Sequence, residues 1–239
     1  MNKKIEGVAF DLDGTLYSNA LFYLRVFPVV LRHWPLMLAM NKARKILHGA
    51  GPPGAALPDF PPEQFYDIQA GLMAQFLKKE RDEIKARAER YIYRRWEPIF
   101  GRLPLFPGVM ETLAALRNAG VRLALLSDFP PETKLANFGI RAFWDVVLCT
   151  EVIGRLKPDP LPFRVLAERM ALPPEKILYV GNSVRYDIRG AKAAGMSAAW
   201  IRPSLFRGAK AGGGPGGKRS GGADFVFTGY RQLAAFVLR

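Results

Sequence analysis

Cysteine and histidine are scarce in this sequence of 239 residues. It has one cysteine, Cys149, and two histidines, His33 and His48. A single thiol cannot form a disulfide framework, so we expect a reducing, cytoplasmic setting and a buried Cys149 that fills part of the core. Two histidines argue against a histidine-rich metal cluster and against hydrolysis by a Ser-His-Asp triad.

The sequence also lacks a hydrophobic run that is long enough and free enough of charge to cross a membrane. The nearest candidate, residues 21–40, is rich in Leu, Val, Phe and Trp but contains Arg25, Arg32, His33 and two prolines. A spanning helix needs about 20 residues almost without charge. We expect this stretch to be a helix packed on the protein, rather than a helix that spans or lies on a membrane, and the charged first residues not to be a signal peptide.

Acidic residues are few relative to basic ones, since 35 Lys and Arg oppose 21 Asp and Glu and give a formal net charge of +14. The excess is spread along the chain and forms no single basic segment. Spread positive charge suits an anionic substrate, or weak nonspecific contact with nucleic acid. No recognisable nucleic-acid-binding motif accompanies it, so we expect no specific nucleic-acid partner. The sequence leaves the oligomeric state open.

Strand-like and helix-like patterns alternate through most of the chain. Apolar, strand-like runs occur at residues 5–10, 121–126, 146–149, 177–180, 198–201 and 225–227, and helical patterns at 108–118, 132–138, 160–170, 187–194 and from 231. This alternation predicts right-handed crossovers and an α/β, Rossmann-like parallel sheet with helices on both faces.

Two segments depart from this rhythm. Residues 18–104 contain long helical patterns, among them 65–96, and predict an all-helical module inserted into a core made of residues 1–17 and 105–239. Residues 204–223 include eight glycines in 20 positions and predict a flexible, basic loop within that core. The G-x-x-x-x-G-K match at 212–218 is accidental, because Arg219 follows where a nucleotide-binding loop has Ser or Thr.

Two carboxylates mark the end of the first strand. Asp11 and Asp13 lie in the segment Asp-Leu-Asp-Gly-Thr, directly after the apolar residues 5–10. Ligands bind at the carboxyl ends of the strands in an open parallel sheet, and Gly14 permits the turn that lets both carboxylates face this crevice. One carboxylate can attack phosphorus while the other handles protons. An acidic turn with Thr15 as a helix cap is the alternative interpretation of this segment alone.

Three later segments bring further polar groups to the same edge. Ser127 and Asp128 end the second strand and can hold a phosphate or cap the following helix. Lys157 precedes a helix and can neutralise phosphate. Asn182 and Asp187 follow another strand and supply the oxygen ligands that Mg²⁺ prefers.

In order and spacing, these four segments resemble the four motifs of the haloacid dehalogenase-like hydrolase superfamily. The resemblance covers roughly residues 5–18 and 105–203, and the inserted module at 18–104 resembles the superfamily's helical cap. The resemblance implies a Mg²⁺-dependent phosphatase that acts on a small phosphorylated metabolite through an aspartyl-phosphate intermediate. Dehalogenase members lack the second carboxylate of the first motif, so Asp13 argues for phosphate chemistry.

The resemblance also implies a role for each site residue. Asp11 is the nucleophile, and Asp13 protonates the leaving alkoxide and then activates water. Ser127 and Asp128 belong to the phosphate-binding segment, and Lys157 offsets charge between the phosphoryl group and Asp11. The Mg²⁺ ligands are then the Asp11 carboxylate, the Asp13 backbone carbonyl, Asn182 and Asp187.

One departure from the family pattern concerns the fourth motif, which commonly begins Gly-Asp. Here Asn182 stands in the Asp position, so the site loses one negative charge and Asp187 is the remaining acid of that motif. Weaker metal affinity is the mild consequence, and a slow or non-catalytic binding protein on the same scaffold is the severe one. A phosphomutase uses the same four motifs and stays open as an alternative.

Substrate identity depends on the cap, whose sequence is less informative. Arg25, Arg32, His33 and Trp34 are candidate contacts to the leaving group, or alternatively surface charges and packing aromatics of a cap helix.

Overall fold

The core is a six-stranded, wholly parallel sheet. The computed structural model describes residues 5–49, 60–202 and 220–239. Its strands are β1 (Gly7–Phe10), β2 (Arg122–Ser127), β3 (Val146–Cys149), β4 (Ile177–Gly181), β5 (Ser197–Ile201) and β6 (Phe225–Phe227), in the spatial order β3-β2-β1-β4-β5-β6. The chain order reverses on either side of β1, so β1 and its neighbours form the switch point where ligands bind in such sheets.

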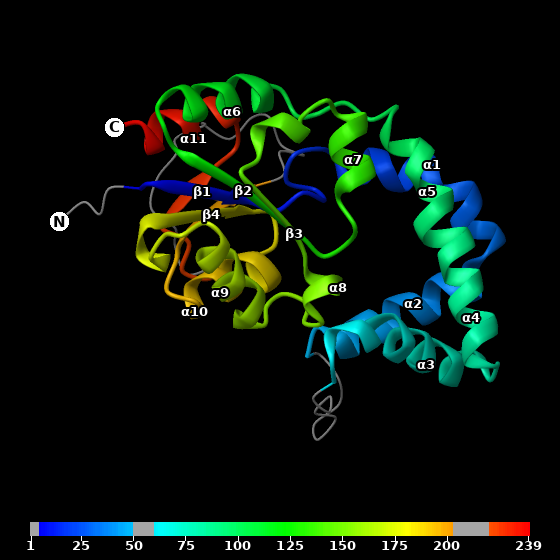
Figure 1. Ribbon diagram of the computed structural model, residues 1–239. Helices are drawn as coiled ribbons and strands as arrows, with labels where there is room; N and C mark the ends of the chain where they lie inside the picture. The colour runs from blue at the N-terminus through cyan, green and yellow to red at the C-terminus, as the bar shows by residue number, and fades with distance from the viewer. Residues whose placement is uncertain (1–4, 50–59, 203–219) are drawn as a thin grey trace.

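Helices cover both faces of this sheet (Figure 1). Helices α6 (Val109–Asn118) and α11 (Tyr230–Val237) pack on one face, and α9 (Pro160–Arg169) and α10 (Arg189–Ala193) on the other. Side chains of β1 alternate accordingly, with Val8 and Phe10 in the first layer and Ala9 in the second. Because side chains of a strand alternate between faces, the apolar run of β1 is buried on both.

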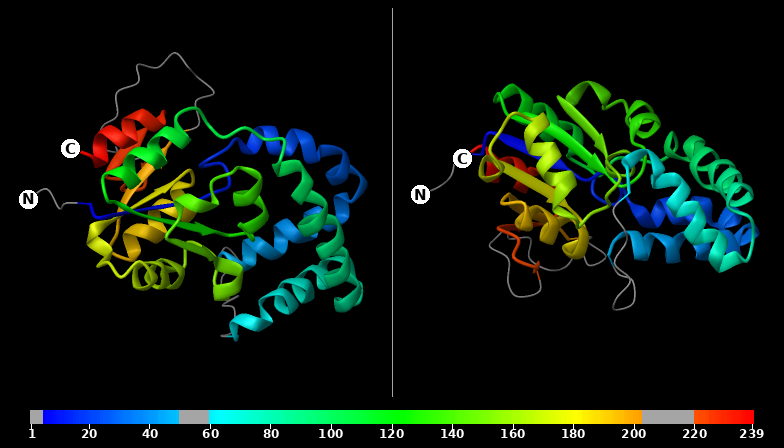
Figure 2. Two further views of the ribbon diagram at one scale, coloured as in Figure 1. Left: turned by 45° about the horizontal axis from the view of Figure 1, so that its top comes forward. Right: turned by 60° about the horizontal axis from the view of Figure 1, so that its bottom comes forward.

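The described residues of the cap region include five α-helices. They are α1 (Asn19–Arg32), α2 (Trp34–Leu47), α3 (Phe65–Leu77), α4 (Arg81–Ala88) and α5 (Arg95–Phe100), with a π-helical turn, Glu89–Arg94, joining the last two. A separate apolar cluster, which includes Leu36, Met40 and Met73, holds the cap together. The carboxyl ends of the strands point toward the cap, and α11 lies on the opposite side of the core (Figures 1 and 2).

The fold prediction is confirmed in its class and in its strands. One helix prediction is wrong, because the pattern at 65–96 contains a break. Lys78 adopts a left-handed backbone conformation with φ +52°, which ends α3 and lets α4 turn back to pack on it. Short helices α7 (Glu132–Asn137) and α8 (Thr150–Ile153) lie where the chain leaves β2 and β3.

No helix among the described ranges combines the length and apolarity needed to cross a membrane. The stretch at 21–40 instead forms α1 and the first half of α2, separated at His33. The predicted glycine-rich loop at 204–223 lies outside the described residues up to position 219.

Candidate active site

The first motif places a buried carboxylate at the end of β1. Asp11 follows the strand directly, and its backbone N–H continues the sheet pattern by donating to the Val180 carbonyl at 2.9 Å. The hydroxyl of Thr15 donates to Asp11 Oδ2 at 2.7 Å. Between them Gly14 takes φ +84°, where an added Cβ would lie 2.1 Å from the Asn182 amide nitrogen. The turn that the sequence predicted at Gly14 therefore requires glycine both for its backbone and for its contact.

Lys157 links the first motif to the fourth. Its ammonium donates to Asp11 Oδ1 at 2.7 Å and to Asp187 Oδ1 at 2.8 Å, and the side chain is 2% exposed. Burial alone would lower the pKa of Lys157, but the two carboxylates outweigh it and raise that pKa well above its ordinary value. Lys157 is therefore a fixed cation beside Asp11.

Asp11 itself is held in an environment that disfavours its charge. Burial raises the pKa of the Asp11 carboxyl to about 7, opposed by the positive charge of Lys157 and assisted by the carboxylates of Asp187 and Asp13. A bound cation reverses this balance, because it favours the ionised carboxylate.

The second motif lies at the end of β2, beside the first. Ser127 Oγ is 3.5 Å from Asp13 Oδ2, and it also accepts the backbone N–H of Phe129 at 3.2 Å. Asp128 accepts from the Thr150 hydroxyl at 2.7 Å and from the Lys157 backbone N–H at 3.3 Å. Burial would raise the pKa of Asp128, but nearby positive charges hold that pKa below its ordinary value. The largest of these effects comes from Lys157. Asp128 thus ties the Lys157 loop to β2.

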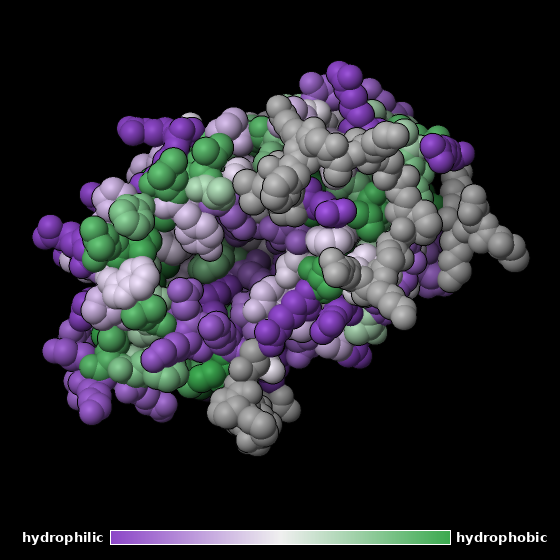
Figure 3. Space-filling model, turned by 180° about the vertical axis from the view of Figure 1, so that it is seen from behind, coloured by the Kyte–Doolittle hydropathy of each residue, from purple (hydrophilic) through white to green (hydrophobic). Residues whose placement is uncertain are grey.

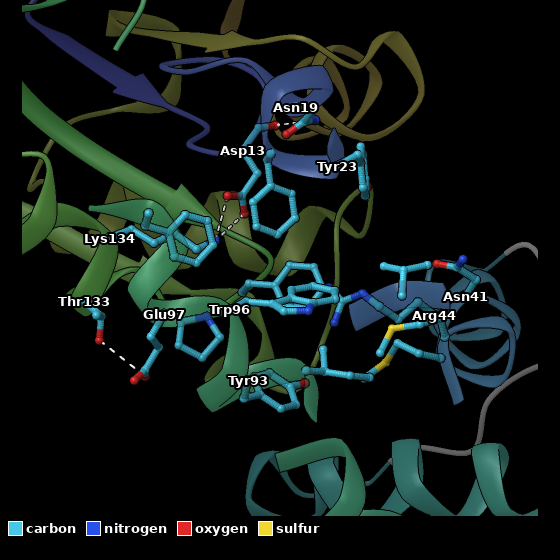
Figure 4. A pocket seen from close by; sticks show the side chains of 18 of the residues that line it. Asp13, Asn19, Tyr23, Asn41, Arg44, Tyr93, Trp96, Glu97, Thr133 and Lys134 are labelled. Atoms are coloured by element: carbon cyan, nitrogen blue, oxygen red, sulfur yellow. Dashed lines mark hydrogen bonds and ion pairs between the residues drawn. The ribbon is translucent and has the colours of Figure 1, made fainter. Parts of the chain in front are cut away.

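Asp13 faces the cap and is held by two groups that no motif identifies. Lys134, on α7, donates to both of its carboxylate oxygens, at 2.6 and 2.7 Å. The Tyr17 hydroxyl donates to the same carboxylate. Figure 4 shows Lys134 and Asp13 facing one another at one end of a pocket. These contacts fix the direction in which the Asp13 carboxylate points.

The fourth motif brings Asn182 and Asp187 to the other side of Asp11. Asn182 donates its amide to the Asp13 backbone carbonyl at 3.3 Å. Asp187 accepts from Lys157 and, through Oδ2, from the Ser183 backbone N–H at 2.9 Å. Gly181 is required here, because a Cβ on it would lie 2.3 Å from Asp187 Cβ.

The donors at this place fit a small, hard cation. They are the Asp11 and Asp187 carboxylates and the Asp13 carbonyl, oxygen groups of the kind that Mg²⁺ takes with one or two carboxylates and water. The Asn182 amide lies beside them with its nitrogen toward the Asp13 carbonyl, and its oxygen would be the group that binds a cation. Within residues 5–49, 60–202 and 220–239, no three Asp, Glu, His or Cys side chains converge as metal ligands. The small carboxylate count agrees with Asn182 standing where the family has an acid.

The cap is joined to the core through a buried ion pair. Arg44 of α2 donates to Glu151 of α8, and its other nitrogen donates to the Asp128 carbonyl at 2.9 Å. Glu151 also accepts from Tyr66 at 3.1 Å and from Tyr93 at 3.0 Å. Asp128 belongs to the second motif, so this hydrogen bond from Arg44 joins the cap directly to a residue of the site.

Between cap and core lies a pocket of about 740 Å³ with Asp13 in its lining. Aromatic side chains dominate its walls, among them Tyr17, Phe22, Tyr93, Trp96, Phe100 and Phe129. Of the four cap residues considered from sequence, Trp34 lines this pocket. Arg25 instead donates to the Arg102 carbonyl, His33 stacks on Tyr91 at 3.9 Å, and Arg32 is exposed.

The structure thus brings all seven residues singled out from sequence to one edge of the sheet. Sequence reasoning missed Lys134, Tyr17, Arg44 and Glu151. Lys134 has one weak signal, a lysine on the otherwise apolar inner side of the short helix that follows the second motif.

Comparison with known proteins agrees with this geometry. The family model of the haloacid dehalogenase-like hydrolases matches residues 5–195. A phosphoglycolate phosphatase of Shigella dysenteriae is 32% identical over 207 residues, which cover 82% of this chain and 81% of the relative. The phosphoglycolate phosphatase of Escherichia coli K12 is 31% identical over 219 residues, with the same coverage of both chains.

Solved structures share the fold at low sequence identity. YfnB of Bacillus subtilis, described as a hydrolase of this family bound to magnesium, has a TM-score of 0.65 at 17% identity and covers 99% of this chain and 100% of its own. A 2-haloacid dehalogenase of Pseudomonas syringae has a TM-score of 0.63 at 22% identity and covers 98% of each chain. Phosphatases and dehalogenases thus share this fold, which by itself does not choose between their reactions. The matched family model and the similarity to the phosphatases together place this chain in the haloacid dehalogenase-like hydrolase family.

Proposed function

We propose that this protein hydrolyses small phosphomonoesters, with Asp11 as the nucleophile and Asp13 as the general acid and base. The observation that carries the proposal is the pair of carboxylates two residues apart at the end of β1. One is buried against the fixed cation Lys157, and the other faces the pocket beside Lys134. A nucleophile and a proton-transfer group in these positions are what in-line phosphoryl transfer requires.

In the first step, an Asp11 carboxylate oxygen forms a bond to phosphorus and the ester P–O bond breaks. Asp13 gives its proton to the departing alkoxide, which leaves as the alcohol. In the second step, Asp13 takes a proton from water as the water oxygen attacks phosphorus. The P–O bond to Asp11 breaks, and inorganic phosphate leaves.

Other residues hold the phosphoryl group and balance its charge. Lys157 places a positive charge 2.7 Å from Asp11, and Ser127 of the second motif places its hydroxyl 3.5 Å from Asp13 Oδ2. Asp128 keeps the Lys157 loop against β2. Mg²⁺, held by the Asp11 carboxylate, the Asp13 carbonyl, Asn182 and Asp187, supplies further positive charge for the transferring group when bound.

Substitution of each carboxylate tests the proposal. Asp11→Asn removes the nucleophile and should abolish Mg²⁺-dependent hydrolysis of a generic phosphate ester. Asp13→Asn keeps the nucleophile and should lower kcat by about 10²–10⁴-fold, the usual effect of a positioned acid or base. Activity that survives in purified Asp11→Asn protein would refute the assignment. 2-Phosphoglycolate, the substrate in the relatives' printed name, belongs among the esters that are compared.

A further inference from the structure

The pocket between cap and core differs from what a short, charged leaving group needs. Its volume of about 740 Å³ falls in the range that holds drug-sized ligands, whereas glycolate has two carbons. In Figure 4 the ring of Trp96 lies between Asp13 and the ring of Tyr93, and both rings come from the cap. A leaving group that starts at Asp13 therefore passes along aromatic walls.

The two buried cations in the lining of the pocket, Arg44 and Lys134, are each paired with a carboxylate. Lys134 is held by Asp13, and Arg44 is held by Glu151 while its guanidinium lies 3.8 Å from the centre of the Phe129 ring. Lys45, the remaining lysine of the lining, is exposed. It is outnumbered by the pocket carboxylates Glu89, Glu97 and Glu132. A second anionic group on the substrate would meet no buried, unpaired cation among the lining residues and would be disfavoured.

Part of the pocket lining lies at an exposed, apolar corner of the cap. This corner includes Trp34 and Leu38 of α2, which line the pocket and are 50% and 41% exposed. Helix α1 also exposes the apolar side chains of Leu24, Phe27 and Leu31. Figure 3 shows hydrophobic side chains gathered over the cap beside a hollow in the surface. Apolar surface thus continues from the aromatic walls to the outside of the cap.

We infer that the preferred substrate is a phosphomonoester whose leaving alcohol is uncharged and hydrophobic, long enough to run from Asp13 along the aromatic walls toward Trp34 and Leu38. This inference rests on the proposed phosphatase function and names its substrate class. Transfer of apolar surface from water to these walls supplies the binding energy, so affinity should grow with the apolar area of the alcohol.

A series of alkyl phosphates tests the inference. Ethyl, butyl and hexyl phosphate have leaving alcohols of similar acidity, so the chemical step is equally demanding in each. We expect kcat/KM to rise by up to about fourfold per methylene, which makes hexyl phosphate better than ethyl phosphate by roughly 10²-fold. We expect 2-phosphoglycolate to be no better than ethyl phosphate. A flat or falling series, or 2-phosphoglycolate better than hexyl phosphate, would overturn the inference.

Variants of Trp34 and Leu38 test the path of the alcohol along the pocket. Leu38→Ala and Trp34→Ala should reduce the gain per methylene. Met110→Ala is the matched control, because Met110 lies on α6, outside the pocket lining, and is as exposed as Leu38 at 41%. Met110→Ala should leave the gain unchanged. An equal gain in all three variants would contradict the proposed path of the alcohol.

Binding measurements keep this inference separate from the proposed function. Calorimetric titration of Asp11→Asn protein with the same esters and Mg²⁺ reports affinity without turnover. If no ester is hydrolysed by the wild type, the proposed function fails. The dependence of affinity on chain length then still tests whether the pocket prefers a hydrophobic alcohol. Tighter binding of hexyl phosphate than of ethyl phosphate supports this preference, and equal binding overturns it.

Discussion

Lys134 faces Asp13 although no motif marks it. Its ammonium contacts both carboxylate oxygens, and the side chain is buried against the rings of Phe100 and Phe129 at 4.9 and 5.5 Å from their centres. A buried lysine needs such a partner, because an unpaired charge out of water is costly. The same contact fixes the carboxylate that is proposed to transfer protons.

Replacing Lys134 by Met keeps the length and apolar packing of the side chain but removes the ion pair. We expect kcat to fall by roughly tenfold with KM changed little, because a misoriented acid and base affects the transition state more than substrate binding. Steady-state kinetics on an alkyl phosphate measures this. Lys192→Met is the matched control, since Lys192 makes an exposed ion pair with Asp224 at 2.9 Å and should leave both constants unchanged. A KM effect alone would remove Lys134 from the positioning of Asp13.

Helices α2 and α8 are joined by a buried ion pair between Arg44 and Glu151. Burial raises the pKa of Glu151, and Arg44 opposes the rise. Arg44→Met leaves Glu151 buried without its cation and should lower the free energy of unfolding by about 3 kcal/mol. Urea unfolding of the variant measures this loss.

The double variant Arg44→Met, Glu151→Gln should recover part of that loss, because no buried charge then remains unpaired. The exposed pair of Arg87 and Glu83, at 3.2 Å, supplies the control. Arg87→Met should change the free energy of unfolding by less than about 0.5 kcal/mol. Equal effects of Arg44→Met and Arg87→Met would show that the buried pair does not hold the cap.

The core could be predicted from sequence more completely than the cap. Strand ends carry Asp11, Ser127 and Asn182, and parallel strands bring such positions to one edge regardless of what covers them. Lys134 and Arg44 acquire partners through packing between segments far apart in the chain, which no local pattern encodes. The left-handed residue Lys78, which divides the helical pattern at 65–96, is likewise not marked by Gly or Pro.

For the molecule as a whole, His48 makes stability depend on pH. Its ring stacks on Tyr186 at 4.4 Å and donates to the Lys157 carbonyl, and burial lowers the pKa of His48 below 6.5. Below that pH, unfolded protein binds a proton at His48 while folded protein does not, so acid favours unfolding. The stability that neutral His48 contributes is fully present above pH 6.5 and is lost as the pH falls below that value.

Wild type should therefore lose more stability than His48→Gln between about pH 7.5 and about pH 5.5. Urea unfolding at both pH values measures the difference. Burial also lowers the pKa of His33, so His33→Gln should reduce the pH dependence in the same direction. An unchanged pH dependence in His48→Gln would contradict the account of His48.

The covalent intermediate on Asp11 is the central claim, and it can be observed directly. Asp13→Asn protein lacks both the acid for the leaving group and the base that activates water, so the substrate must have a leaving group that departs without a proton. With p-nitrophenyl phosphate this variant should form the aspartyl-phosphate but hydrolyse it slowly. We would mix the variant with p-nitrophenyl phosphate and Mg²⁺, quench with acid, and measure the masses of its peptides. The account predicts one phosphoryl group on Asp11, and none when Asp11 is also replaced by Asn. A phosphoryl group on another residue, or no labelled peptide while phosphate is still released, would contradict it.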